Sequence, residues 1–347
     1  MAHIQLKNIT KKFGSHTALR RLNLDIADGE FFVLLGETGA GKTTTLRIIA
    51  GLDKPTEGQV LIDGVDVADW GAAERDVALV LQQYSLYPRY TVRQNLEFPL
   101  KSKLRRVPDA EIAERVSRVA KTLRIEHLLE RKTDRLSGGE MQRVSIGRAI
   151  VRKPRVFLMD EPLSALDAKL REAMQVELRQ LQQKLGITTI VVTHDQREAM
   201  TMADTVVVMS GGEIRQAASP IEIYRRPADS FVADFIGQTN LLDVTGDSSG
   251  RAVVLGQAVP GLELPAGAAK GTLSVRPEDV HLTAPGAGAL TGKVTFVRDL
   301  GGTIETFVDI AGHQIVAVST PRARPDVSVG QEVGIALTPD VCVVLKK

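Results

Sequence analysis

Residues 36–44 read Gly36-Glu37-Thr38-Gly39-Ala40-Gly41-Lys42-Thr43-Thr44 and match the phosphate-loop pattern G-x-x-x-x-G-K-[ST] without a mismatch. An apolar run precedes this loop, and a run typical of a helix follows it. The glycines let backbone N–H groups curve around phosphate oxygens, and the N-terminus of the helix adds partial positive charge. Lys42 is expected to reach the β- and γ-phosphates, and Thr43 to ligate Mg²⁺. The stretch predicts an α/β phosphate-loop domain; a glycine-rich turn without function is the alternative.

The composition excludes several classes of protein. The 347 residues exceed one typical domain, so two or three are expected. A net charge of +2 gives no argument for a nucleic-acid partner. The single cysteine, Cys342, allows no internal disulfide and fits a reducing cytoplasm. No signal peptide is expected, and no apolar run approaches the roughly 20 residues of a spanning helix. A role at a membrane would therefore require docking onto another protein.

Three further apolar runs end in polar side chains: Gln82, the pair Asp160 and Glu161, and His194. Carboxyl ends of parallel strands meet at one sheet edge, beside the phosphate loop, so these side chains are expected near Lys42. Adjacent residues on a strand point to opposite sides, which gives the two acids different roles. Asp160 suits the Mg²⁺ shell, and Glu161 suits polarising an attacking water. Gln82 is a metal ligand or a surface residue on this pattern, and the histidine is catalytic or structural.

Residues 136–140 read Leu-Ser-Gly-Gly-Glu and open a predicted helix. Ser137 is a favourable N-cap, and Glu140 three residues later completes a capping box. Capping does not explain Gly138 and Gly139. The two glycines suggest a close approach of the backbone to a ligand.

Three other features leave alternatives open. Residues 104–131 have helical spacing with one apolar face, which predicts a packing face. Residues 84–92 hold three tyrosines, which indicates a contact surface or a small local core. Phe13 could stack on an adenine ring or pack at the sheet edge.

From about Gly237 the pattern changes to short alternating segments separated by glycine and proline, which predicts a small all-β barrel domain. Some barrels of this type bind oligonucleotides through exposed aromatic residues. Phe296 and Phe307 are the only aromatic residues after Phe235, which disfavours that function.

In order and spacing, these motifs resemble those of the ATP-binding-cassette ATPases over residues 1 to about 235. The Leu-Ser-Gly-Gly run discriminates this family from other phosphate-loop families. The resemblance implies roles position by position: adenine stacking for Phe13, phosphate and Mg²⁺ handling for Lys42, Thr43, Gln82 and Asp160, general base for Glu161, and γ-phosphate positioning for His194.

The resemblance also implies a dimer of two chains that face each other head to tail. Ser137, Gly138, Gly139 and Glu140 of one chain would then cap the ATP bound to Lys42 of the other. A homodimer with two working sites is expected, and a heterodimer with a related chain is the alternative. ATP and Mg²⁺ are the implied cofactors.

Residues 219–224, 231–237 and 276–279 resemble the maltose-transporter type of importer ATPase, which carries a C-terminal TOBE domain. The implied domains are a nucleotide-binding domain at 1–236, with a helical subdomain at about 88–152, and an OB-like regulatory β domain at 237–347.

This subclass implies a peripheral ATPase on the cytoplasmic face of the inner membrane. Two transmembrane permease subunits would dock at residues 84–92, and an extracytoplasmic solute-binding protein would act indirectly. The implied cargo is a sugar, a glycoside or a similar small solute; glycerol phosphate, a polyamine and ferric iron are alternatives.

Glu140 stands where the family usually has Gln, Glu37 where Pro or Ser is common, and Phe13 where Tyr is usual. Activity is still expected, because the backbone donors remain. Two rivals are a non-transport cassette ATPase and a small-molecule kinase. The first usually has two cassettes, long inserts or basic arms, and the second has no need of residues 136–140.

Overall fold

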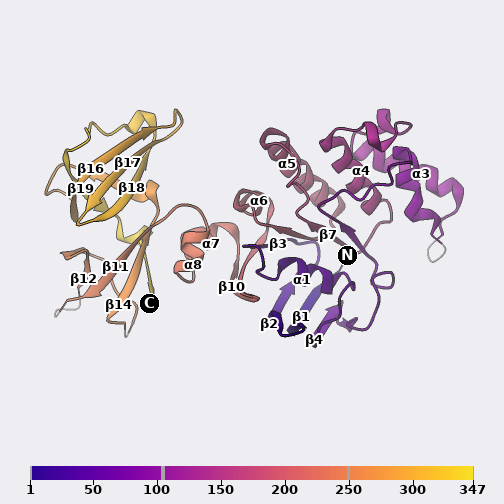
Figure 1. Cartoon of the computed structure of the whole chain (residues 1–347), viewed down its shortest axis with the longest axis horizontal. Helices are drawn as coiled ribbons and strands as arrows, with labels where there is room; N and C mark the ends of the chain where they lie inside the picture. The colour runs from indigo at the N-terminus through magenta and orange to yellow at the C-terminus, as the bar shows by residue number, and fades with distance from the viewer. Residues whose placement is uncertain (1, 103–105, 248–250, 267, 347) are drawn as a thin grey trace. The chain divides into compact units, whose positions relative to one another are not determined.

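The computed structural model describes residues 2–102, 106–247, 251–266 and 268–346 of the chain. The chain divides into two compact units, Met1–Pro220 and Ile221–Lys347. The first unit contains two sheets and the helices α1 to α6. The second unit is built mainly from short antiparallel strands (Figure 1).

The central sheet of the first unit has six strands in the order β10-β9-β3-β8-β7-β6. The pairs β9–β3, β3–β8, β8–β7 and β7–β6 are parallel, and β10 is antiparallel to β9. The continuous apolar runs of the sequence form the parallel strands, since both faces of such a sheet are covered. The parallel strands are β3 (Phe31–Gly36), β6 (Val77–Val80), β7 (Val156–Asp160), β8 (Thr188–Thr193) and β9 (Thr205–Ser210), and the antiparallel edge strand is β10 (Glu213–Ala218).

A second, antiparallel sheet has the order β2-β1-β4-β5. It comprises β1 (Ile4–Phe13), β2 (His16–Ile26), β4 (Glu57–Ile62) and β5 (Val65–Asp66). Helix α1 (Lys42–Ile49) lies between the sheets and buries Leu46, Ile48 and Ile49. One hydrophobic core joins both sheets and this helix, so the loop before α1 is held by packing from two sides.

The remaining helices of this unit are α2 (Val92–Glu97), α3 (Asp109–Thr122), α4 (Gly138–Ile150), α5 (Ala168–Leu185) and α6 (Gln196–Met202). Helices α2 and α3 both contact α4, and α3 lies beside α4 in Figure 1. The predicted helix over 104–131 is wrong in extent, and its first two residues lie outside the described residues. Pro108 precedes α3 as its N-cap, and Arg124, just after the helix, has a φ of 55°. A left-handed residue cannot continue an α-helix, so only a short 3₁₀ turn, Glu126–Leu128, follows.

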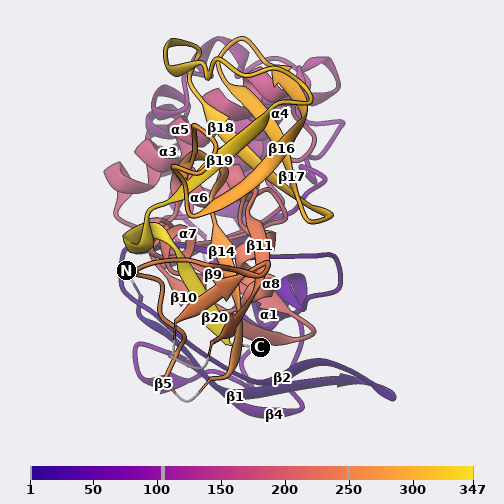
Figure 2. The same cartoon turned by 90° about the vertical axis from the view of Figure 1, so that its left-hand side faces the viewer.

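The second unit confirms the predicted all-β domain as two five-stranded antiparallel sheets, ordered β13-β12-β11-β14-β20 and β15-β19-β16-β17-β18. Figure 2 labels β11, β14 and β20 of the first of these sheets and β16, β17, β18 and β19 of the second. Residues of both sheets form a single hydrophobic core. The strands are β11 (Asn240–Gly246), β12 (Ala252–Val254), β13 (Gln257–Ala258), β14 (Lys270–Val275), β15 (Val280–Thr283), β16 (Leu290–Asp299), β17 (Ile304–Ile310), β18 (His313–Ser319), β19 (Glu332–Leu337) and β20 (Val343–Lys346).

Arg276 connects these sheets to the two short helices before them, α7 (Pro220–Arg225) and α8 (Ser230–Phe235). Its guanidinium donates to the carbonyls of Tyr224, Ala233 and Gln238 at 3.0–3.1 Å, and it stacks on the Tyr224 ring at 4.1 Å. These bonds assign both helices to the second unit. We therefore propose a domain boundary near residue 220, earlier than the one expected after residue 236.

Candidate functional site

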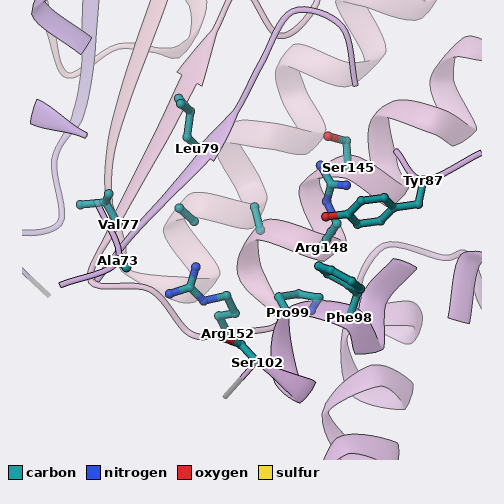
Figure 3. Close-up of a pocket in the computed structure, with 12 residues that line it drawn as sticks. Ala73, Val77, Leu79, Tyr87, Phe98, Pro99, Ser102, Ser145, Arg148 and Arg152 are labelled. Carbon is teal, nitrogen blue, oxygen red and sulfur yellow. The ribbon is translucent and has the colours of Figure 1, made fainter. Parts of the chain in front are cut away.

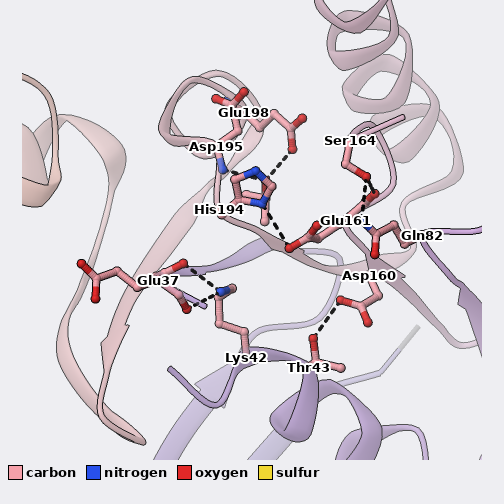
Figure 4. Close-up of polar contacts among 12 residues, drawn as sticks. Glu37, Lys42, Thr43, Gln82, Asp160, Glu161, Ser164, His194, Asp195 and Glu198 are labelled. Atoms are coloured by element: carbon pink, nitrogen blue, oxygen red, sulfur yellow. Dashed lines mark hydrogen bonds and ion pairs between the residues drawn. The ribbon is translucent and has the colours of Figure 1, made fainter. Parts of the chain in front are cut away.

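Helix α1 begins at Lys42, whose side chain is buried inside its own loop (Figure 4). The Lys42 Nζ donates to the carbonyls of Gly36 and Glu37, both at 2.8 Å. Burial lowers the pKa of Lys42, while the carboxylates of Glu161 and Asp160 act in the opposite direction. The Glu37 carboxylate points away from the ammonium group. The Glu37 side chain therefore does not occupy the interior of the loop, which is filled by the Lys42 ammonium group.

Strand β2 fixes the loop from outside, which the sequence did not reveal. Gly41 has a φ of 99°, and a Cβ there would lie 2.6 Å from Leu19 Cδ2 and 2.9 Å from the Ala18 carbonyl oxygen. Glycine is required at this position for its conformation and for the close approach of β2. No local motif encodes this contact, because Ala18 and Leu19 belong to another sheet.

The parallel register brings the strand ends to one edge of the central sheet. Asp160 at the end of β7 pairs with Val192, and Thr193 at the end of β8 pairs with Leu35, next to the loop. The Thr43 hydroxyl donates to Asp160 Oδ1 at 3.1 Å. Burial raises the pKa of Asp160, and the Thr43 hydrogen bond opposes that rise. The predicted neighbourhood of Thr43 and Asp160 is therefore present.

Glu161 stands at the centre of the polar contacts just beyond β7 (Figure 4). Its Oε1 lies 3.1 Å from His194 Nδ1, and its Oε2 accepts from Gln82 Nε2 at 3.2 Å. The Gln82 amide also donates to Ser164 Oγ at 3.3 Å. Glu161 has a φ of 46°, a strained conformation for a residue other than glycine. The structure thus brings Gln82, Glu161 and His194, three of the four strand-end residues that the sequence singled out, into direct contact.

The turn that carries His194 rests on a buried carboxyl group absent from the predicted set. Glu198 of α6 is 2% exposed and accepts from the Thr193 hydroxyl at 2.7 Å. Burial raises the pKa of Glu198, and the Thr193 bond counteracts it. Glu198 lies in the first turn of α6, just after the end of β8. This position in the sequence is a signal that could have identified it as a residue supporting the loop of His194.

The N-terminus of α4 confirms the predicted capping box. The Glu140 Oε2 accepts from the Ser137 N–H at 2.8 Å and from its hydroxyl at 2.9 Å, and the Glu140 N–H donates back at 3.4 Å. The Ser137 backbone bond lowers the pKa of Glu140 below its ordinary 4.5, and Arg131 at 3.8 Å also contributes. The carboxylate is therefore engaged by its own helix.

Gly138 and Gly139 of α4 differ in their surroundings. A Cβ on Gly139 would lie 2.9 Å from Leu170 Cδ2, so packing against α5 accounts for this glycine within the chain. A Cβ on Gly138 would meet its nearest neighbour, Leu166 Cδ2, at an ordinary 3.4 Å. Phe13 ends β1 with 49% exposure, and the Lys11 Nζ lies 4.8 Å from its ring centre. Contact of Gly138, Gly139 or Phe13 with a nucleotide stays a prediction.

A substitution pair at Glu140 tests the cap. Glu140→Ala is expected to lower the free energy of unfolding by about 0.3–1.5 kcal/mol, whereas Glu140→Gln keeps the hydrogen bonds of the box and should lose only the smaller part that the ionised carboxylate contributes. A lowered carboxyl pKa stabilises the folded state above about pH 4.5, and this stabilisation is lost as the pH falls through the folded-state pKa. Urea unfolding between pH 3 and 7 measures both effects. Equal stability of the two variants would contradict the capping role.

Comparison with known families is unambiguous. The family "ABC transporter" matches residues 19–164, and the family "TOBE domain" matches residues 273–345. The trehalose/maltose import ATP-binding protein MalK of Thermococcus litoralis is 45% identical, over 96% of this chain and 95% of the relative. The chain belongs to the ATP-binding-cassette transporter family. The sn-glycerol-3-phosphate import ATP-binding protein UgpC of Rhizobium meliloti is 50% identical, over 81% of this chain and 79% of that protein.

Solved ABC structures share the fold of the first unit. The dimeric post-hydrolysis state of the ATP-binding cassette MJ0796, bound to ADP and Pi, has a TM-score of 0.55 and 36% identity, over 62% of this chain and 98% of that chain. The cbiO1 structure from Clostridium perfringens has a TM-score of 0.60 and 29% identity, over 64% and 90%. This ABC chain is accordingly an ATP-binding and ATP-hydrolysing subunit of the importer type. Within its described ranges, no helix is long and apolar enough to cross a membrane.

Proposed function

We propose that this ABC subunit hydrolyses ATP at Glu161 to power uptake of a sugar or glycerol-phosphate class of solute through separate permease subunits. The convergence of Lys42, Asp160, Glu161 and His194 at one sheet edge carries the ATPase part of the proposal. The solute class rests on the relatives, whose names specify trehalose/maltose and sn-glycerol-3-phosphate import.

The polar groups beside the loop fit Mg²⁺. Thr43 and Asp160 already meet at 3.1 Å, and the Gln82 side chain supplies a further oxygen at the same edge. In residues 2–102, 106–247, 251–266 and 268–346, no group of three or more His, Cys, Asp or Glu side chains could hold a metal by itself. Mg²⁺ is usually bound by few protein carboxylates, and the phosphates of the substrate complete its ligand shell. When bound, this ion would offset the charge of the phosphates.

Lys42, Glu161 and His194 are proposed to have different roles in hydrolysis. Lys42 is placed to exchange its bonds to loop carbonyls for bonds to phosphate oxygens. Glu161 is placed to orient a water and take its proton, since a carboxylate in contact with Gln82 and His194 has a fixed direction. His194, with a side chain 60% exposed, is positioned to donate to the γ-phosphate.

The chain is proposed to act as a head-to-tail homodimer. The N–H groups of Gly138 and Gly139 lie at the start of α4, where an α-helix makes no backbone hydrogen bonds to its own first N–H groups and where partial positive charge suits a phosphate from a second chain. Ser137 is exposed at this end, and Glu140 is turned into the capping box. The solved dimer of MJ0796 with ADP and Pi supports the arrangement.

The permease subunits are proposed to dock in an aromatic groove of the first unit (Figure 3). Its volume is about 330 Å³, and Tyr87, Phe98, Arg148 and Arg152 are among its lining residues. The rings of Tyr87 and Phe98 lie 4.5 Å apart and are 38% and 46% exposed. Exposed aromatic rings beside arginines are typical of protein interfaces. Peripheral attachment to the inner membrane, on its cytoplasmic face, would follow from this docking.

Tyr87→Ala with Phe98→Ala is expected to reduce co-purification with the permease subunits by about tenfold or more, because large aromatic anchors dominate interface energies. The ATPase rate of the isolated subunit should stay within about twofold, since neither ring contacts the catalytic groups. Trp70→Ala is the matched control: Trp70 is 44% exposed and does not line the groove. Equal losses in both variants would contradict docking at the groove.

The solute class is tested by reconstitution. The subunit, its genomic-neighbour permeases and their solute-binding protein would be placed in proteoliposomes with maltose, trehalose, glycerol phosphate, a polyamine or ferric iron. Stimulation of ATP hydrolysis and uptake by a sugar or glycerol phosphate is expected. Stimulation only by the polyamine or iron would overturn the proposed class and leave the ATPase assignment in place.

A further inference from the structure

The side chain of Arg171, one turn into α5, bonds two different loops. Its Nε donates to the Leu163 carbonyl at 3.3 Å, and its Nη2 donates to the Leu166 carbonyl at 2.9 Å. Its Nη1 reaches Asp195 Oδ2 at 3.5 Å. The guanidinium has five N–H donors in a rigid fork, so one side chain can fix three acceptors in a defined geometry.

The first of these loops begins at Glu161. The Glu161 N–H donates to the Val192 carbonyl at 2.9 Å, and its own carbonyl accepts from the Ser164 hydroxyl at 3.0 Å. The segment from Glu161 to Leu166 is therefore short and internally bonded. Holding the carbonyls of Leu163 and Leu166 restrains the backbone that directs the Glu161 carboxylate.

The second loop carries His194 immediately before Asp195. The Asp195 Oδ1 accepts from the N–H groups of Arg197 and Glu198 at 2.8 and 3.3 Å and so caps α6. Its own N–H donates to the Thr193 hydroxyl at 3.0 Å. Asp195 is thus the fixed point of the turn, and its second oxygen faces Arg171.

These contacts close a ring of interactions. Arg171 bonds the loop of Glu161 on one side and the loop of His194 on the other. Between the two loops, Glu161 Oε1 lies 3.1 Å from His194 Nδ1. We propose that Arg171 is a positioning residue that sets the contact between His194 and Glu161. The importance of this contact for hydrolysis rests on the proposed function.

The alternative is that Arg171 only stabilises the fold, through its ion pair with Asp195. A second arginine of α5 serves as the control. Arg179 lies about two helical turns further along. It donates to Asp204 Oδ2 at 2.9 Å, and its guanidinium lies 5.6 Å from the ring centre of Phe31, at the start of β3. The side chains of Arg171 and Arg179 are 30% and 25% exposed, so the two arginines are similarly buried. Only Arg171 touches the loops of Glu161 and His194.

The experiment compares full-length Arg171→Gln, Arg171→Lys and Arg179→Gln. Arg171→Gln is expected to lower kcat about 10- to 100-fold with KM within about twofold, because a small misplacement of catalytic groups costs rates of this order. Arg171→Lys should recover only part of kcat, since one ammonium group cannot span three acceptors. Arg179→Gln should lower Tm at least as much and keep the wild-type kcat.

A second readout avoids turnover altogether. The His194 ring nitrogen signals, assigned with His194→Gln, would be recorded by NMR in the nucleotide-free protein. They should move in Arg171→Gln and stay in place in Arg179→Gln. If the His194 signals stayed in place in Arg171→Gln, the positioning role would be overturned. The role would also be overturned if Arg171→Gln kept the wild-type kcat while Glu161→Gln was inactive. Moved signals with full activity of Glu161→Gln would sustain the positioning role and overturn the proposed catalytic base instead.

Discussion

Replacing Glu161 by Gln is expected to lower the rate of ATP hydrolysis by about 10²- to 10⁴-fold and to leave an ATP-bound dimer. The amide keeps the size of the side chain, and its carbonyl oxygen can still accept the hydrogen bond that Gln82 donates to Glu161 at 3.2 Å in the wild-type structure. It cannot take a proton from water at neutral pH. ATP binding should survive, because Lys42 and Thr43 are unchanged. Phosphate release measures the rate, and sizing chromatography with ATP measures the dimer.

Glu172→Gln is the matched control for this variant, since Glu172 is an exposed acid on the neighbouring helix α5. It should hydrolyse ATP at the wild-type rate and show no ATP-trapped dimer. If Glu161→Gln stayed monomeric with ATP, the head-to-tail arrangement would be refuted. If it turned over like Glu172→Gln, the base would have to be sought elsewhere at the sheet edge.

The sequence predicted the position of the polar sheet edge well because each signal was local. An apolar run followed by a polar residue indicates a buried strand and its carboxyl end, and parallel pairing then places Asp160, Glu161 and His194 beside the loop. The capping box of Ser137 and Glu140 was equally local. The residues that support the edge are not local, since Leu19 approaches Gly41 from another sheet. Tertiary contacts of this kind leave no periodic signal in one sequence.

Other differences from the sequence-based expectations lie away from the sheet edge. Apolar spacing beyond α3 continues in a helical pattern, yet the left-handed Arg124 ends regular helix there. In the second unit, the alternating segments 271–275, 292–297, 303–310, 314–319 and 331–337 correspond to the strands β14, β16, β17, β18 and β19. Short strands such as Gln257–Ala258 have too few residues for alternation to show. The proposed boundary near residue 220 depends on Arg276, which bonds backbone carbonyls far away along the chain.

Lys42→Met is the second substitution with a large expected effect. Hydrogen bonds from a charged group contribute about 1.5–3 kcal/mol, so ATP binding should weaken by about 10- to 100-fold, with a further loss in hydrolysis. The side chain is 6% exposed, and methionine fills a similar volume, so the fold should persist. Fluorescent-nucleotide titration measures the affinity, and Tm confirms folding. Wild-type affinity in a folded variant would remove Lys42 from the phosphate site.

The lowered pKa of Lys42 predicts a proton signature of the same contact. Its folded-state pKa lies below the ordinary 10.5, so between these two values the unfolded chain binds more protons and stability rises with pH. Phosphate charge favours the protonated amine, so ATP binding at alkaline pH should take up a proton. Calorimetry in buffers of different ionisation enthalpy measures that uptake, and Lys42→Met should abolish it. Unchanged proton uptake in the variant would show that another group near the phosphates titrates, since Lys42 is the buried amine of the loop.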